Sequence, residues 1–107
     1  EFGLDCVDWS GYEDIKKYAW QKVLHIYEVP FYYIEYGFAQ LGAIAVWRNY
    51  CNNKQKAIES YQNALKLGYT KTIGEIYNAA DIQFNFSSDY VKELVDFVNA
   101  ELKKVEE

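Results

Sequence analysis

The sequence predicts an all-α protein, a helical bundle of about five helices with no dependable sheet. Apolar residues recur at spacings of three and four along most of the chain, and capping residues, one proline and several glycines mark where helices begin and end. Residues 82–86, IQFNF, alternate as a strand does, but this segment is too short and isolated to form a sheet. At 107 residues, the chain is expected to form one helical domain over residues 1–107.

The first helix is expected to begin near Gly11, because Ser10 stands three residues before Glu13 in the pattern of a capping box. It should end or kink at Val29, because proline disfavours helical geometry in the residue before it, here Val29 before Pro30. Two adjoining apolar rows predict that this helix is buried over a wide arc. The rows are Ile15, Ala19, Val23 and Ile26, and Trp20, Leu24 and Tyr27.

The next helix is expected from Phe31 to about Tyr50 and is apolar on almost all sides. Such a helix must be surrounded by other elements. Gly37 and Gly42 lie within it, and each costs up to about 1 kcal/mol in helix propensity unless a neighbour approaches closely. We therefore expect tight packing at both glycines.

The remaining helices have local boundary signals. Residues 51–53, Cys51, Asn52 and Asn53, are expected to form a turn with good N-cap chemistry before a helix that Gly68 ends. Thr72 and Glu75 form a capping box before a short helix, and Ser88 is expected to cap the last helix. The apolar face of that last helix consists of Val91, Leu94, Val95, Val98, Leu102 and Val105.

Composition excludes several classes of partner. A net charge of −5 argues against nucleic acid, whose phosphates require a surplus of basic residues. No apolar run reaches the roughly 20 residues that a membrane span needs, and no secretory signal is visible. Cys6 and Cys51 do not form a CxxC pair, so we expect both to be reduced and the protein to be cytoplasmic. With one histidine, the chain lacks a ligand set for zinc of its own.

The segment 25–37, HIYEVPFYYIEYG, places the only histidine and four tyrosines around the only proline. A buried tyrosine needs a hydrogen-bond partner, so this density indicates either a richly bonded core or a pocket. Tyr33 and Tyr36 are three residues apart and would project from the same side of a helix, whereas Tyr32 would point elsewhere. Taken alone, His25 is more often a packing residue than a catalytic one at such a position.

Residues 25–50, HIYEVPFYYIEYGFAQLGAIAVWRNY, resemble the segment near the C-terminus of oligoendopeptidase F, a zinc metallopeptidase of the thimet oligopeptidase superfamily. The similarity continues through KAIESYQNALKLGYTKTIGEIYNAADIQFNFSSDYVKELVDFV and covers nearly the whole chain from Ser10 onward. One departure is Asp81, where the family favours glycine and where a turn would suit it. The resemblance implies that the chain is the C-terminal part of a larger peptidase.

In that family, a HExxH helix and a downstream glutamate hold the zinc, and none of these residues is in this chain. The resemblance implies that the segment forms a wall of the cleft in which oligopeptides are hydrolysed. His25, Tyr33 and Tyr36 match the residues that stabilise the oxyanion, with the first tyrosine open between Tyr32 and Tyr33. Zinc is thus expected in the full-length family but not in this chain, which is expected to be inactive by itself. Its partners would be the remainder of the peptidase and the oligopeptide substrate.

Two alternatives stay open. The chain could be a stand-alone helical module that binds a peptide or protein through a tyrosine-rich groove, in which His25 and the tyrosines bind the partner and do no chemistry. It could also be a bundle in which the tyrosines only pack. The aromatic content of 19% predicts apolar surface that more protein would cover. We therefore also expect self-association through exposed apolar surface, as a dimer or a partly opened bundle.

Overall fold

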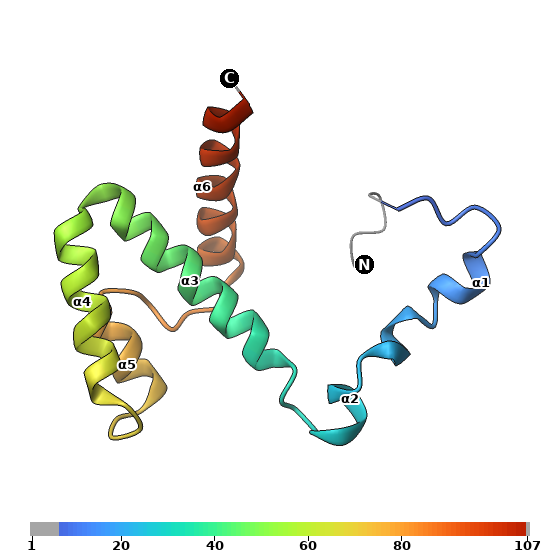
Figure 1. Cartoon of the computed structure of the whole chain (residues 1–107), viewed down its shortest axis with the longest axis horizontal. Coiled ribbons are helices and arrows are strands. Elements are labelled where there is room, and N and C mark those ends of the chain that lie inside the picture. The colour runs from blue at the N-terminus through green and yellow to red at the C-terminus, as the bar shows by residue number, and fades with distance from the viewer. Residues whose placement is uncertain (1–6, 107) are drawn as a thin grey trace. The chain divides into compact units, whose positions relative to one another are not determined.

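The structure, a computed structural model, describes residues 7–106. Within them the chain forms six α-helices and one 3₁₀-helix and no strand, so the all-α prediction is confirmed (Figure 1). The chain divides into two compact units, Glu1–Ile34 and Glu35–Glu107.

The first unit contains three short helices, α1 (Glu13–Lys16), the 3₁₀-helix η1 (Ala19–Lys22) and α2 (His25–Glu28). The expectation of one long helix, buried over a wide arc, was wrong, because none of the three short helices contains a buried residue. Leu24, from one of the predicted rows, is 61% exposed. Helices shorter than about 12 residues depend on packing for their stability, so apolar rows without a covering partner do not hold a continuous helix.

The start of α1 has only part of the predicted capping box. The Ser10 hydroxyl donates to Asp8 Oδ1 at 2.6 Å and does not cap the helix, whose N-cap residue is Tyr12. Glu13 does reach back, but its carboxylate accepts from the backbone N–H of Gly11 at 3.0 Å. Because the local turn with Asp8 takes the serine, α1 begins at Glu13, two residues after the expected start.

The predicted break at Pro30 is confirmed, since α2 ends at Glu28 and the chain turns before α3 (Ile34–Asn52) begins. Phe31 has a φ of 65°, which a right-handed helix excludes. The helix expected from Phe31 therefore starts three residues later. As a consequence, Tyr32 and Tyr33 lie in the turn and not on a helix.

The caps of α4 (Lys54–Leu67) and α5 (Ile73–Ala79) agree with the sequence, although the turn expected over residues 51–53 is reduced to Asn53, because α3 continues to Asn52. The Asn53 side chain accepts from the backbone N–H of Lys56 at 3.1 Å, and Gly68 ends α4 with a φ of 52°. Both hydrogen bonds of the Thr72 and Glu75 capping box are present. These signals act within three or four residues, so no distant partner is needed to realise them.

The cap of α6 (Ser88–Glu106) differs by one residue from the prediction. Ser88 is the first residue of the helix, and the Ser87 hydroxyl accepts from the Tyr90 backbone N–H at 3.3 Å. The Ser87 backbone N–H in turn donates to Asn85 Oδ1 at 2.9 Å. This local turn selects the first of two adjacent serines as the cap.

A small core joins the helices of the second unit. Its buried residues are Ala45, Ala64, Ala80, Ile82, Tyr90 and Leu94. Arg48 of α3 pairs with Glu93 of α6 at 2.6 Å, and the Trp47 ring meets the Phe97 ring edge-on at 4.9 Å. Because three of the six core residues are alanines, much of the larger apolar surface of this unit is left uncovered.

The segment between α5 and α6 has no regular structure, as expected. Its alternation of apolar and polar residues nevertheless has a physical cause. Ile82 is buried, and the Phe84 and Phe86 rings lie 5.3 and 4.5 Å from the Phe38 ring of α3. An extended chain places every second side chain on one side. The three apolar residues of this segment therefore pack against the bundle without forming a sheet.

Close packing at the two glycines of α3 is confirmed at one and wrong at the other. A Cβ on Gly42 would lie 2.9 Å from the Tyr77 hydroxyl oxygen, and that hydroxyl donates to the Phe38 carbonyl at 3.0 Å. A Cβ on Gly37 would meet no heavy atom of the described residues within 4 Å. Other elements of the described residues therefore pack closely against only part of the α3 surface, and not around the whole helix as predicted.

Candidate functional site

His25 lies in a cluster with two tyrosines of the first unit. The imidazole is the first side chain of α2, and its ring centroid is 6.0 Å from that of Tyr32, with the planes 10° apart. The Tyr33 ring is also 6.0 Å from the imidazole, tilted by 37°. The turn that follows Pro30 brings both tyrosines back toward α2. Two of the three predicted site residues, His25 and Tyr33, are therefore neighbours.

The expectation that Tyr32 points elsewhere was wrong, since its ring stacks on the imidazole. That expectation assumed helical geometry, in which adjacent side chains diverge by about 100°. Residues 31–33 form a turn, and its geometry lets both rings face His25. Both rings lie 6.0 Å from the imidazole, so either Tyr32 or Tyr33 can be the first tyrosine of the site.

Tyr36, the third predicted residue, lies in α3 and belongs to the second unit. Its side chain is 50% exposed. The predicted shared helix face with Tyr33 is not formed, because Tyr33 precedes the first residue of α3. A role for Tyr36 beside His25 stays a prediction.

The His25 cluster has groups suited to binding an anionic oxygen. Phenol hydroxyls and imidazole N–H groups donate hydrogen bonds, and both Tyr32 and Tyr33 are 41% exposed. A ligand can therefore reach these rings from solvent. Donors aimed at a developing negative charge are the usual way in which proteins stabilise tetrahedral intermediates of acyl transfer.

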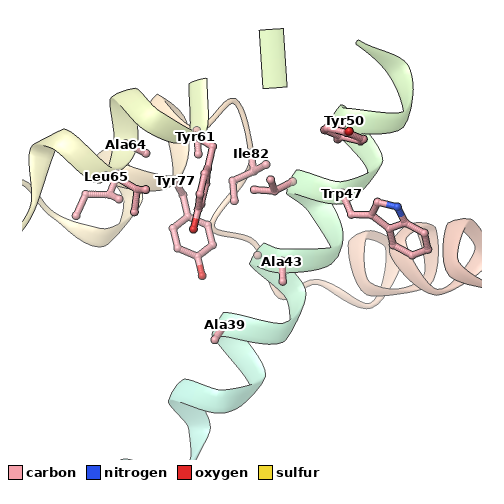
Figure 2. Close-up of a pocket in the computed structure, with 13 residues that line it drawn as sticks. Ala39, Ala43, Trp47, Tyr50, Tyr61, Ala64, Leu65, Tyr77 and Ile82 are labelled. Atoms are coloured by element: carbon pink, nitrogen blue, oxygen red, sulfur yellow. The ribbon is translucent and has the colours of Figure 1, made fainter. Parts of the chain in front are cut away.

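The second unit contains an apolar groove of about 490 Å³ (Figure 2). Small side chains of α3, Ala39 and Ala43, and Ala64 of α4 leave the space, and Trp47 and Tyr61 are among the larger side chains around it. The remaining lining residues are Gly42, Val46, Tyr50, Leu65, Ile76, Tyr77, Ala80 and Ile82. The sequence placed a tyrosine-rich groove at His25 and the tyrosines near it, whereas the tyrosines that line this groove are Tyr50, Tyr61 and Tyr77. A signal was present in residues 39, 43, 46 and 50, which alternate by four and three along α3.

The phenol of Tyr77 lies in a partly desolvated part of the groove. Burial raises the pKa of the Tyr77 phenol above its usual value, and the interaction with Tyr90 raises it further. The neutral phenol is held in place by its hydrogen bond to Phe38. At the edge, the Lys54 ammonium lies 5.5 Å from the centre of the Tyr50 ring, so the groove has a basic group beside an apolar interior.

Residues 7–106 contain neither a candidate metal-binding cluster nor a candidate membrane span. This part of the chain contains no group of three or more His, Cys, Asp or Glu side chains that could hold a metal ion. It also contains no helix with the length and apolar character needed to cross a bilayer. The Cys51 thiol is exposed and free, and Cys6 lies outside the described residues.

Together these observations define an all-α protein with an accessible histidine and tyrosine cluster and a separate apolar groove. Comparison with known protein families, curated proteins and solved structures found no match for the chain. The function must therefore be argued from the residues and their geometry.

Proposed function

We propose that this chain is the C-terminal, cleft-forming part of an oligoendopeptidase F-like zinc metallopeptidase that hydrolyses oligopeptides, and that the chain alone is inactive. The observation that carries the proposal is the contact of the His25 imidazole with Tyr32 and Tyr33 in an accessible position. These residues belong to the segment that resembles the family. In this proposal His25, Tyr33 and Tyr36 bind and stabilise the oxyanion.

The chemistry of peptide hydrolysis explains why such groups would be placed together. Addition of water to a peptide carbonyl puts negative charge on its oxygen, and each preorganised donor contributes about 2.7 to 4 kcal/mol of transition-state stabilisation. The described residues supply donors but no zinc ligand set. The metal would be held by the remainder of the peptidase and would polarise the carbonyl and activate the water.

Exposed apolar surface supports the idea that further polypeptide covers this chain. Ile15, Trp20 and Leu24 of the first unit are 59%, 48% and 61% exposed, although all three belong to the predicted apolar rows. Soluble monomers rarely expose contiguous apolar patches larger than a few hundred Å². A covering domain that carries the HExxH helix would remove this surface from water.

The test uses the longer polypeptide in which an in-frame HExxH sequence and a downstream glutamate precede this segment. We expect His25→Gln and Tyr33→Phe each to lower kcat by about 100-fold to 1000-fold with a smaller effect on KM, because each removes a transition-state donor. Tyr69→Phe is the matched control, since Tyr69 is fully exposed between α4 and α5. Zinc content should be equal in all variants.

Two outcomes would contradict the assignment of this chain to a larger zinc peptidase. One is hydrolysis of peptides by the purified 107-residue chain with added zinc. The other is a start codon close upstream of Glu1 without any HExxH sequence in the gene. If His25→Gln had the same kcat as the Tyr69→Phe control, His25 would have no catalytic role.

A second candidate function is favoured by the groove. As a stand-alone helical interaction module, the chain would bind a partner peptide or protein between α3 and α4, and His25 and the tyrosines would take part in no chemistry. Under that function, Ala43→Glu would abolish partner binding, whereas His25→Gln would not affect it. Both candidates include a cytoplasmic location with reduced cysteines, and neither involves nucleic acid or a membrane.

A further inference from the structure

The second unit exposes an apolar stripe on α6 in addition to the groove. The α6 stripe consists of Val91, Val95, Val98, Leu102 and Val105, whose spacing alternates by four and three. This is the repeat with which one helix packs along another. Leu102 and Val105 are 54% and 85% exposed, so the C-terminal half of the stripe is uncovered in the single chain.

We propose that two copies of this chain associate reciprocally, with the α6 stripe of each copy seated in the groove of the other. This pairing concerns the chain itself and requires neither zinc nor catalysis. It therefore goes beyond the proposed function and can fail independently of it.

The groove is better suited to a helix than to an extended peptide. Its lining side chains come largely from the helices α3 and α4, whose interior backbone N–H and C=O groups are already bonded within each helix. An extended peptide would leave its own backbone groups unpaired against such walls, whereas a helix satisfies them internally. The occupant is therefore a helix with an apolar face.

The sizes of the two surfaces are complementary. Ala39, Ala43 and Ala64 leave room in the groove, and the α6 stripe presents valines and a leucine. Large side chains on one helix fit into the spaces between residues of a facing helix when the floor is made of small residues. The spacing of four and three in α3 residues 39, 43, 46 and 50 matches that of the stripe.

The charges of the two surfaces are also complementary. Helix α4 has three lysines against one glutamate, but Lys56 is already paired with Asp81, which leaves a net charge of +1. Helix α6 has five acidic residues against three lysines, but Glu93 is already paired with Arg48, which leaves a net charge of −1. Lys54 lies beside the groove residue Tyr50. The attraction between α4 and the α6 of a second copy offsets part of the repulsion between two chains of charge −5 and favours this pairing over α6 against α6.

Reciprocal exchange about a two-fold axis closes the assembly. Each copy contributes one groove and one stripe, so the contact between groove and stripe is made twice and neither a groove nor a stripe is left without a partner. A one-way arrangement would instead continue from copy to copy as an open chain. The proposal therefore specifies a dimer and no larger assembly.

Sedimentation equilibrium of the full chain over a wide concentration range tests the proposal. We expect a monomer–dimer equilibrium that Leu102→Asp and Ala43→Glu each weaken by about tenfold or more, because either change buries a charge in an apolar interface. Ala100→Asp on α6 and Gln40→Glu on α3 are matched controls. They add the same charge outside the stripe and outside the groove lining, and they should leave the dimer intact. Circular dichroism establishes that each variant is folded.

Cross-linking identifies the surfaces that meet. With Cys6 and Cys51 replaced by serine, Leu102→Cys in one population and Tyr61→Cys in another should form an intermolecular disulfide on mixing, whereas neither population alone should do so to the same extent. A monomer at all concentrations would overturn the proposal, as would a dimer that survives either Leu102→Asp or Ala43→Glu. A monomer whose groove binds an added amphipathic peptide would assign the groove to a foreign partner and would overturn it too.

Discussion

Gly42 offers a direct test of how the groove is built. A methyl group at this position would lie 2.9 Å from the hydroxyl oxygen of Tyr77 and 3.2 Å from its Cζ. The phenol cannot move away freely, because its hydroxyl donates to the Phe38 carbonyl at 3.0 Å. Gly42→Ala therefore forces an overlap between a helix and a hydrogen-bonded ring.

The magnitude follows from three opposing contributions. Overpacking costs about 1 to 3 kcal/mol, and weakening of the Tyr77 hydrogen bond costs about 1 kcal/mol. Replacing a glycine by alanine within a helix raises the free energy of unfolding by about 1 kcal/mol through helix propensity. We expect Gly42→Ala to lower the free energy of unfolding by about 1 to 3 kcal/mol.

Urea unfolding followed by circular dichroism measures this change, and Gly37→Ala is the matched control on the same helix. A methyl group on Gly37 has open space, so that variant should raise the free energy of unfolding by about 0.5 to 1 kcal/mol. Tyr77→Phe combined with Gly42→Ala should recover part of the loss, because it removes the nearest atom. If Gly42→Ala stabilised the protein as Gly37→Ala does, the close approach of Tyr77 to α3 would be refuted.

Two further predictions concern local structure. Asp81 has a φ of 60°, a backbone conformation that glycine adopts without strain. Asp81→Gly should therefore raise the free energy of unfolding by up to about 1 kcal/mol, despite loss of the exposed Lys56 ion pair, and Asp81→Ala should lower it. Urea unfolding midpoints measure both changes, and equal effects of the two variants would contradict backbone strain at Asp81. Hydrogen bonds from the Thr72 backbone and hydroxyl lower the pKa of Glu75 below 4.5. A carboxyl group with a lowered pKa adds stability above its unfolded-state pKa and loses it as the pH falls through the folded-state pKa. Stability should therefore decline on acidification below about pH 4.5 by more in the wild type than in Glu75→Gln, and identical pH profiles would exclude this role for the capping box.

The parts of the fold that were predicted correctly depend on short-range chemistry. The caps at Asn53 and Thr72, the stop at Gly68 and the break before Pro30 all act within a few residues. The choice of Ser88 in place of Ser87 failed by one position, because the turn made by Asn85 decides which serine faces the helix end. Local signals therefore located the helix ends of the second unit to within a few residues.

The candidate site was predicted only in part. The sequence singled out His25 and Tyr33, and the structure brings their rings together. It did not reveal the stacking of Tyr32, because a positive φ at Phe31 turns the chain where helical spacing was assumed. The groove was equally hidden, since its walls come from helices whose separation no local pattern specifies.

By itself, the sequence determined that the chain is helical, where most helices of the second unit begin and end, and which face of each is apolar. These properties follow from backbone geometry and from hydrogen bonds between residues close in the chain. Only the tertiary structure decided which apolar faces are covered. It also decided that the first predicted helix is divided into three short helices, and that Tyr77 packs against Gly42 while no side chain of the described residues packs against Gly37. The reason is that the burial of a helix face depends on which residues distant in the sequence pack against it. The apolar periodicity of that face is the same with or without such packing.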